Sequence, residues 1–285
     1  MSVVENIASG GAASFCMNLA RERDFPGYAA ALFVPPVPRR AFFALAAFNV
    51  EVAHVRDLIS QPMPGEIRLQ WWRDVVTGAA QPDGNPVATE LLAAVAQYEL
   101  PRETLIRLID AHVFDVYDDP MPDMAALEAH CRDTSAALFA LRAKILGTDL
   151  AAIERCADHA GIAEGLVDVM TTLPKHAARR QLYLPADLLN LKDANAVDIF
   201  LHRATPQLGD VLAHLRAEAS RQYDSAMTLL RDVPKHARGA FLPLALVTNN
   251  LERLARTEPF APKQSSRLST LWTLWRATRS QPFKA

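Results

Sequence analysis

Apolar residues recur along this chain at the spacing of helices. The period-2 alternation of β-strands is almost absent, and prolines and glycines separate the periodic segments. In segment 206–231 one stripe holds Val211, Leu212, Leu215, Ala219, Tyr223, Met227 and Leu230. The pattern predicts an all-α chain with helices over 11–23, 38–59, 64–79, 86–99, 101–118, 123–146, 149–173, 206–231, 236–257 and 264–279.

Length and charge narrow the picture. A chain of 285 residues that is 50% hydrophobic can bury about 75% of its unfolded surface around one core. No shift in composition marks a boundary, so we predict a single domain over residues 1–285. The net charge is -2 and no strongly basic face is evident, which argues against a nucleic-acid partner.

The cysteines and the hydrophobic segments predict a compartment. Cys16, Cys131 and Cys156 lie far apart without metal-ligand spacing, which favours buried thiols in a reducing environment. The N-terminus lacks the pattern of a signal or transit peptide. No stretch has the roughly 18 apolar residues of a spanning helix. We therefore expect a cytoplasmic protein that touches a membrane only peripherally, at the surface of the inner membrane.

The stretch 161–185 is the most informative part of the chain. Small residues such as Gly161 and Gly165 alternate with bulky ones such as Leu166, which is typical of a helix that approaches a neighbour closely around a buried space. The helix is predicted to end at Pro174. A basic run follows, formed by Lys175, His176, Arg179 and Arg180, and then Tyr183-Leu184-Pro185.

Gly161-Ile162-Ala163, the Ala-Ala-Arg-Arg turn at 177–180 and Tyr183-Leu184-Pro185 resemble the second signature of the squalene/phytoene synthases. These are all-α enzymes that join two prenyl diphosphates, and the resemblance implies an isoprenoid-synthase-like helical bundle with a central cavity. In the family, acidic or amide side chains four residues apart share a helix face and hold magnesium. The matching positions here are Asp168, Thr172 and His176, of which only Asp168 is an acid.

The first signature is also changed. The segment 47–57 follows Arg39 and Arg40, and its resemblance to the Asp-Asp-x-x-Asp motif places Ala53, His54 and Asp57 at the carboxylate positions. Bound metal supplies several kcal/mol to the ionisation of the diphosphate. The resemblance therefore implies negligible turnover, with no catalytic residue and no metal or other cofactor. The alternative is a magnesium-dependent head-to-head prenyltransferase with an altered metal site.

Cations stand where the family has acids. They include His54, Arg56 and the basic run after Pro174, and they could contact an anion directly. A prenyl diphosphate or a phospholipid fits this chemistry, and a solvated basic loop is the competing interpretation. The predicted ligand-binding set is Arg39, Arg40, His54, Asp57, Asp168, Lys175, His176, Arg179, Arg180 and Tyr183.

Two other acidic groups are candidate cation sites. Glu164 and Asp168 are four residues apart and could hold one hard cation, but we favour a surface pair or an ion pair with nearby arginines. Asp115, Asp118 and Asp119 have the i, i+3, i+4 spacing of a metal cluster. They precede a proline, so a solvated helix end is the preferred interpretation.

Further residues indicate a branch of the family. The run Pro-Gly-Glu-Ile-Arg-Leu-Gln-Trp-Trp-Arg-Asp at 64–74 and Phe48-Asn49-Val50-Glu51 are similar to the branch that includes a mitochondrial complex I assembly factor. This implies a non-catalytic protein whose partners are complex I subunits. A lipid carrier without a protein partner is a third possibility. Phe139 stands where the synthases leave room for a prenyl chain, which implies a narrowed cavity.

The last predicted helix carries an aromatic stripe. Its apolar members are Leu268, Leu271, Trp272 and Trp275, and Arg267, Arg276 and Arg279 flank them. Such a face suits docking onto a membrane surface or a partner subunit. Packing as the last core helix gives the same periodicity, and exposure of the tryptophans distinguishes the two.

Overall fold

The computed structural model describes residues 3–82, 84–263 and 265–284, and the predicted all-α class is confirmed because this part contains helices and no strand. The α-helices are α1 (Val3–Arg23), α2 (Phe25–Ala31), α3 (Pro36–Ala53), α4 (Pro62–Thr77), α5 (Pro86–Tyr98), α6 (Arg102–Ala111), α7 (Val113–Tyr117), α8 (Met124–Cys131), α9 (Ala137–Ile145), α10 (Glu154–Ala178), α11 (Ala186–Leu191), α12 (Ala196–Phe200), α13 (Pro206–Leu229), α14 (Val247–Arg256) and α15 (Arg267–Ala277). Short 3-10 segments cover Val55–Leu58, Leu150–Ala152 and Lys235–Leu246, and Arg132–Ala136 is π-helical.

Several predicted helices prove to be composite. The helix predicted over 101–118 is divided at His112 into α6 and α7, and the π-helical turn separates α8 from α9. The first half of the helix predicted over 236–257 is a 3-10 segment with Pro243 inside it. Proline has no amide hydrogen to donate and crowds the preceding turn of an α-helix, which favours the tighter winding here. Short helices α2, α11 and α12 were not predicted.

The central helix α10 does not end where the sequence predicts. Pro174 lies inside the helix, which continues to Ala178. The loss of one amide donor is tolerated because Leu173 and Ala177, on either side of the proline, are buried against the core. Lys175 and His176 are consequently helical residues, and the predicted loop is wrong for both.

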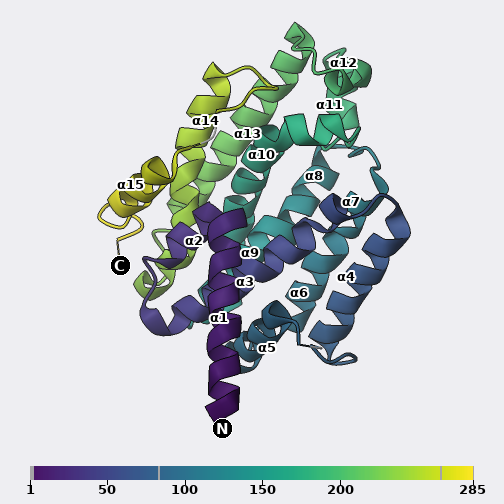
Figure 1. Cartoon of the computed structure of the whole chain (residues 1–285). Helices are drawn as coiled ribbons and strands as arrows, with labels where there is room; N and C mark the ends of the chain where they lie inside the picture. The colour runs from purple at the N-terminus through teal and green to yellow at the C-terminus, as the bar shows by residue number, and fades with distance from the viewer. Residues whose placement is uncertain (1–2, 83, 264, 285) are drawn as a thin grey trace.

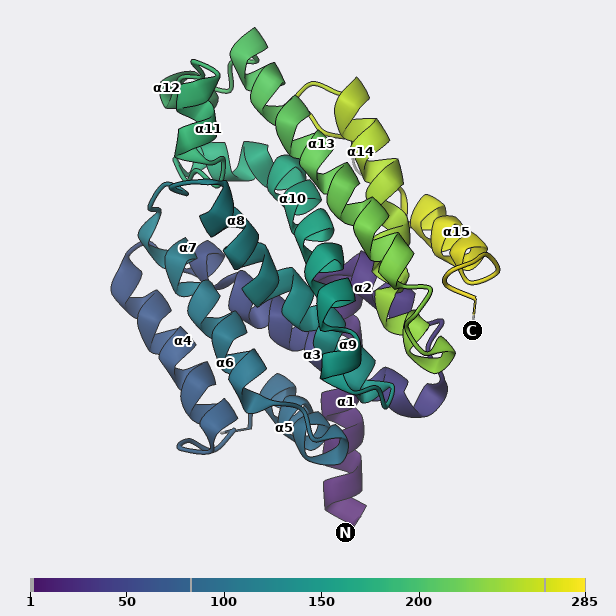
Figure 2. The same ribbon diagram turned by 180° about the vertical axis from the view of Figure 1, so that it is seen from behind.

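Helix α10 is the centre of the molecule. It lies beside α13 along its length, with α8 and α9 on its other side, as both views show (Figures 1 and 2). Gly161 allows the closest approach, since a Cβ built there would be 2.2 Å from the backbone nitrogen of Ala136 in the π-helical turn. A side chain of any size at position 161 would push these elements apart.

The apolar interior is divided into two clusters. One surrounds α10 and α13 and includes Leu166, Leu215 and Phe241. The other joins α1, α3, α4, α5 and α6 and includes Phe48 and Trp72. Trp72 is fully buried whereas Trp71 is only partly buried.

Candidate functional site

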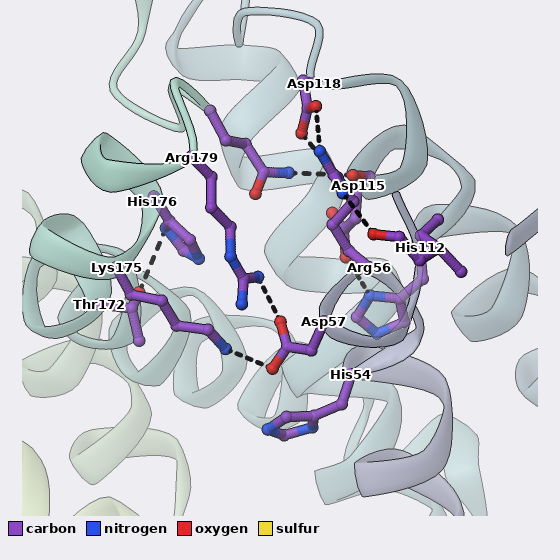
Figure 3. Close-up of polar contacts among 12 residues, drawn as sticks. His54, Arg56, Asp57, His112, Asp115, Asp118, Thr172, Lys175, His176 and Arg179 are labelled. Carbon is purple, nitrogen blue, oxygen red and sulfur yellow. Dashed lines mark hydrogen bonds and ion pairs between the residues drawn. The ribbon is translucent and has the colours of Figure 1, made fainter. Parts of the chain in front are cut away.

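Asp57 joins the end of α3 to the end of α10. After α3 the chain turns through Val55–Leu58, and this turn directs Asp57 toward two cations of α10's last turns. Lys175 Nζ donates a hydrogen bond of 2.8 Å to Asp57 Oδ2, and Arg179 donates to Oδ1 (Figure 3). Burial alone would raise the pKa of Asp57, but the two donors outweigh it and lower the pKa. Asp57 is therefore charged at neutral pH, with both of its oxygens bonded.

Asp168 and Glu164, on the same face of α10, lack such partners. No hydrogen bond or ion pair from the described residues reaches either carboxylate. The Asp168 side chain is accessible to solvent, yet the protein around it raises its pKa to about 6 by desolvation, against the attraction of Lys175. Water therefore reaches the carboxylate, but the surrounding protein leaves its charged form incompletely solvated.

Glu164, one turn earlier on α10, is only partly exposed. Desolvation raises its pKa to about 7, opposed by the charge of Arg142 on α9. Arg142 is buried, with only 6% of its surface exposed, and it forms no ion pair with Glu164. Neither Glu164 nor Asp168 forms the predicted ion pair with neighbouring arginines. The repulsion of Asp24, at the start of α2, adds to the pKa shift of both.

The two predicted histidine cations are neutral at pH 7. Burial lowers the pKa of His54, and nearby Lys175 lowers it further; its Nδ1 lies 2.9 Å from the Val50 carbonyl oxygen. Burial also lowers the pKa of His176, to about 4, and its ring centre lies 4.6 Å from that of Tyr183. Burial therefore disfavours the protonated, positively charged form of both rings.

The arginines of the predicted site are dispersed. Arg180 has a left-handed backbone (φ 60°) and places its guanidinium 5.6 Å from the centre of the Phe200 ring, toward α12. Arg39 donates to the carbonyl oxygens of residues 32 and 34, and Arg40 pairs with Glu90. Both are near the first turn of α3, and the helical rise separates them from its last turn by about 20 Å. The structure therefore does not gather these three with Lys175 and Arg179.

A second polar group, missed by the sequence interpretation, lies beside Tyr183. Asp115 is buried, accepts a hydrogen bond from the Tyr183 hydroxyl and lies 2.6 Å from His112 Nδ1. Gln181 Nε2 donates to the Tyr183 oxygen over 3.1 Å. Burial would raise the pKa of Asp115, but its interactions with His112, His130 and Tyr183 together lower it. The spacing of three residues between His112 and Asp115 was the feature of the sequence that could have indicated this pair.

Arg56 forms an ion pair with Asp118 on the same side of Asp57 as Asp115. Its guanidinium donates to both oxygens of Asp118, at 2.9 and 2.5 Å. Asp115 is buried, so the predicted solvated helix end is wrong for it, whereas Asp118 at the end of α7 is partly exposed and held in this two-pronged pair. Figure 3 shows these pairs on one side of Asp57 and the α10 cations on the other. Asp57, Asp115 and Asp118 are thus each hydrogen-bonded to other side chains of the chain.

The residues present do not fit the magnesium site of the resembling family. Asp57 has its oxygens engaged by two cations, and Thr172 donates its hydroxyl to the Asp168 carbonyl instead of offering a carboxylate. No group of three or more His, Cys, Asp or Glu side chains in the described ranges is arranged to hold a metal ion. Divalent magnesium requires several well-placed oxygen ligands.

The fold and the altered motifs together indicate the protein family to which the chain belongs. The profile of the squalene/phytoene synthase family matches residues 20–276, and the chain belongs to that family. A solved squalene synthase from Alicyclobacillus acidocaldarius covers 90% of this chain and all of its own with a TM-score of 0.74; its identity of 24% supports the fold alone.

Curated relatives point to the predicted branch. The human protein named "NADH dehydrogenase (ubiquinone) complex I, assembly factor 6" is 30% identical over 246 residues, which are 86% of this chain and 74% of the human one. A presqualene diphosphate synthase of Sinorhizobium fredii is 29% identical over 161 residues, covering 55% of this chain and 57% of its own. The similarity to the assembly factor thus extends over more of the chain.

Proposed function

We propose that this chain is a non-catalytic member of its family that acts in the assembly of respiratory complex I. The observation that carries the proposal is the pairing of Asp57 with Lys175 and Arg179, which engages the one carboxylate left in the first metal motif. The extended similarity to the human assembly factor supports complex I subunits as partners. The proposed place of action is the cytoplasmic side of an inner membrane.

Catalysis is opposed by the electrostatics of the site. Breaking the bond of an allylic diphosphate separates charge, and the family relies on metal for stabilisation of several kcal/mol, each ~1.4 kcal/mol being tenfold in rate. Here the positive charge of Lys175 and Arg179 is partly neutralised by Asp57. Protein incubated with magnesium and farnesyl diphosphate is expected to release no diphosphate above background. Steady release that disappears in Asp168→Ala would support the prenyltransferase alternative instead.

The assembly role is tested in the organism that carries this gene. Its deletion is expected to reduce the amount of assembled complex I in membranes and the NADH-dependent quinone reduction they support. A plasmid copy with Asp168→Ala is expected to restore both, because a metal-binding carboxylate is not needed. Normal complex I in the deletion strain would contradict the proposal.

We also propose a ligand for the site: a phosphate-bearing lipid, either a prenyl diphosphate or a phospholipid, that replaces Asp57 on Lys175 and Arg179. Phosphate oxygens can accept from the same two donors. Inorganic pyrophosphate and glycerol phosphate are suitable probes for titration calorimetry. Asp57→Asn is expected to strengthen binding and Arg179→Gln to weaken it, whereas Arg203→Gln, in the loop after α12, serves as a control. Unchanged binding in both Asp57→Asn and Arg179→Gln would exclude this pair as the anion site.

A further inference from the structure

Helix α15 is firmly attached along one face and uncovered on the other. Leu274 is fully buried, and the helix packs against α2 and the Lys235–Leu246 segment. On the outer face Leu268 is 79% exposed and Trp272 59% exposed. The prediction that this is only a last core helix is therefore incomplete, because a large aromatic side chain remains in water.

Cations border the exposed aromatic face. The rings of Trp272 and Trp275 are stacked with their centres 4.9 Å apart, and the Arg279 guanidinium lies 3.6 Å from the centre of the Trp275 ring. On the other side Arg267 lies 4.9 Å from the centre of the Phe25 ring in α2. The surface thus combines an apolar centre with fixed positive charges at its margin.

The charge of the C-terminal segment differs from that of the rest of the chain. Residues 259–285 include five cationic residues, Lys263, Arg267, Arg276, Arg279 and Lys284, and no acidic residue. The other 258 residues contain 25 lysines and arginines against 32 acids. An anionic surface would therefore attract this end of the molecule and repel much of the remainder, which would orient the chain.

We propose that α15 docks the chain onto a bilayer containing anionic lipids, with Leu268 and Trp272 entering the interface and the neighbouring arginines meeting the headgroups. Tryptophan with flanking arginine is the composition that binds in the interfacial plane. No helix in the described ranges is long and apolar enough to cross a membrane, so the contact proposed is a surface one. The inference goes beyond the proposed function and does not use the Asp57 site.

Vesicle co-sedimentation of the full chain tests the proposal. Wild-type protein is expected to bind phosphatidylcholine vesicles that contain phosphatidylglycerol, and to bind pure phosphatidylcholine weakly. Replacing both Leu268 and Trp272 by serine should lower the partition coefficient at least about tenfold, because the buried apolar area is lost. Met63→Ser with Ile67→Ser is a matched control, since these residues have the same spacing and are 71% and 64% exposed on α4.

The electrostatic part has its own variant. Arg276→Gln with Lys284→Gln removes two exposed cations, and each is expected to lower partitioning about fivefold at low salt. Circular dichroism establishes that every variant is folded, as expected for surface positions. Equal binding of wild-type protein to both vesicle types, unchanged binding of the Leu268 and Trp272 variant, or loss of binding only in the α4 control would overturn the proposal. Binding to a protein partner without vesicle binding would overturn it as well.

Discussion

Glu164 provides a quantitative test of the interior electrostatics. Its pKa is raised from 4.5 to about 7, so the folded state holds this proton more tightly than the unfolded state. The associated stabilisation is complete below about pH 4.5 and is lost as the pH rises through about 7. Fully ionised Glu164 then costs the fold about 3 kcal/mol, from roughly 1.36 kcal/mol per pKa unit.

The substitution Glu164→Gln removes the ionisation while preserving size. We expect the variant to exceed the wild type in free energy of unfolding by under about 1 kcal/mol near pH 5 and by about 3 kcal/mol near pH 8. Urea unfolding followed by circular dichroism measures both. Glu154→Gln, at an exposed position in the first turn of α10, should show no comparable pH-dependent gain. A Glu164→Gln gain that is equal at the two pH values, or absent near pH 8, would refute the reasoning.

Two further tests concern packing and thiols. Gly161→Ala should lower the free energy of unfolding by about 1–3 kcal/mol or more, because its Cβ would overlap the backbone of the π-helical turn. Gly209→Ala on α13, where a Cβ meets nothing within 4 Å, should instead stabilise by roughly 0.5–1 kcal/mol in the same urea titration. Burial raises the pKa of all three cysteine thiols to about 12. A disulfide reagent near pH 8 should therefore label the thiols slowly in native protein and rapidly in urea. Rapid labelling of the native protein would contradict their burial.

The sequence predicted the helices that carry clear local signals. Helix α13 begins at Pro206 behind the Thr205 cap, as its stripe and proline indicated, and α5 begins in the same way at Pro86 behind Asn85. The end of α10 was misplaced because tertiary burial of its last turns outweighs the local effect of Pro174. Propensity is a weak guide where packing decides.

The candidate site could be predicted only in part. Family resemblance identified Asp57 and Lys175 as neighbours of one site, but their direct pairing joins residues 118 positions apart and depends on side-chain directions. The orientation of Arg180 depends on a left-handed backbone that its sequence does not indicate. The neutral state of His176 follows from burial, which becomes known only once the helices are packed.

The Asp57 pairing also bears on how reversible the change of the metal motifs is. Restoring aspartates at Thr172 and His176 would recreate the family spacing on α10, but Lys175 and Arg179 would still bind Asp57 and would attract the new carboxylates too. Each restored acid would gain an internal salt bridge before it could serve a metal ion. A single added carboxylate would therefore first face two cations that Asp57 already occupies, so the spacing alone would not create a magnesium site.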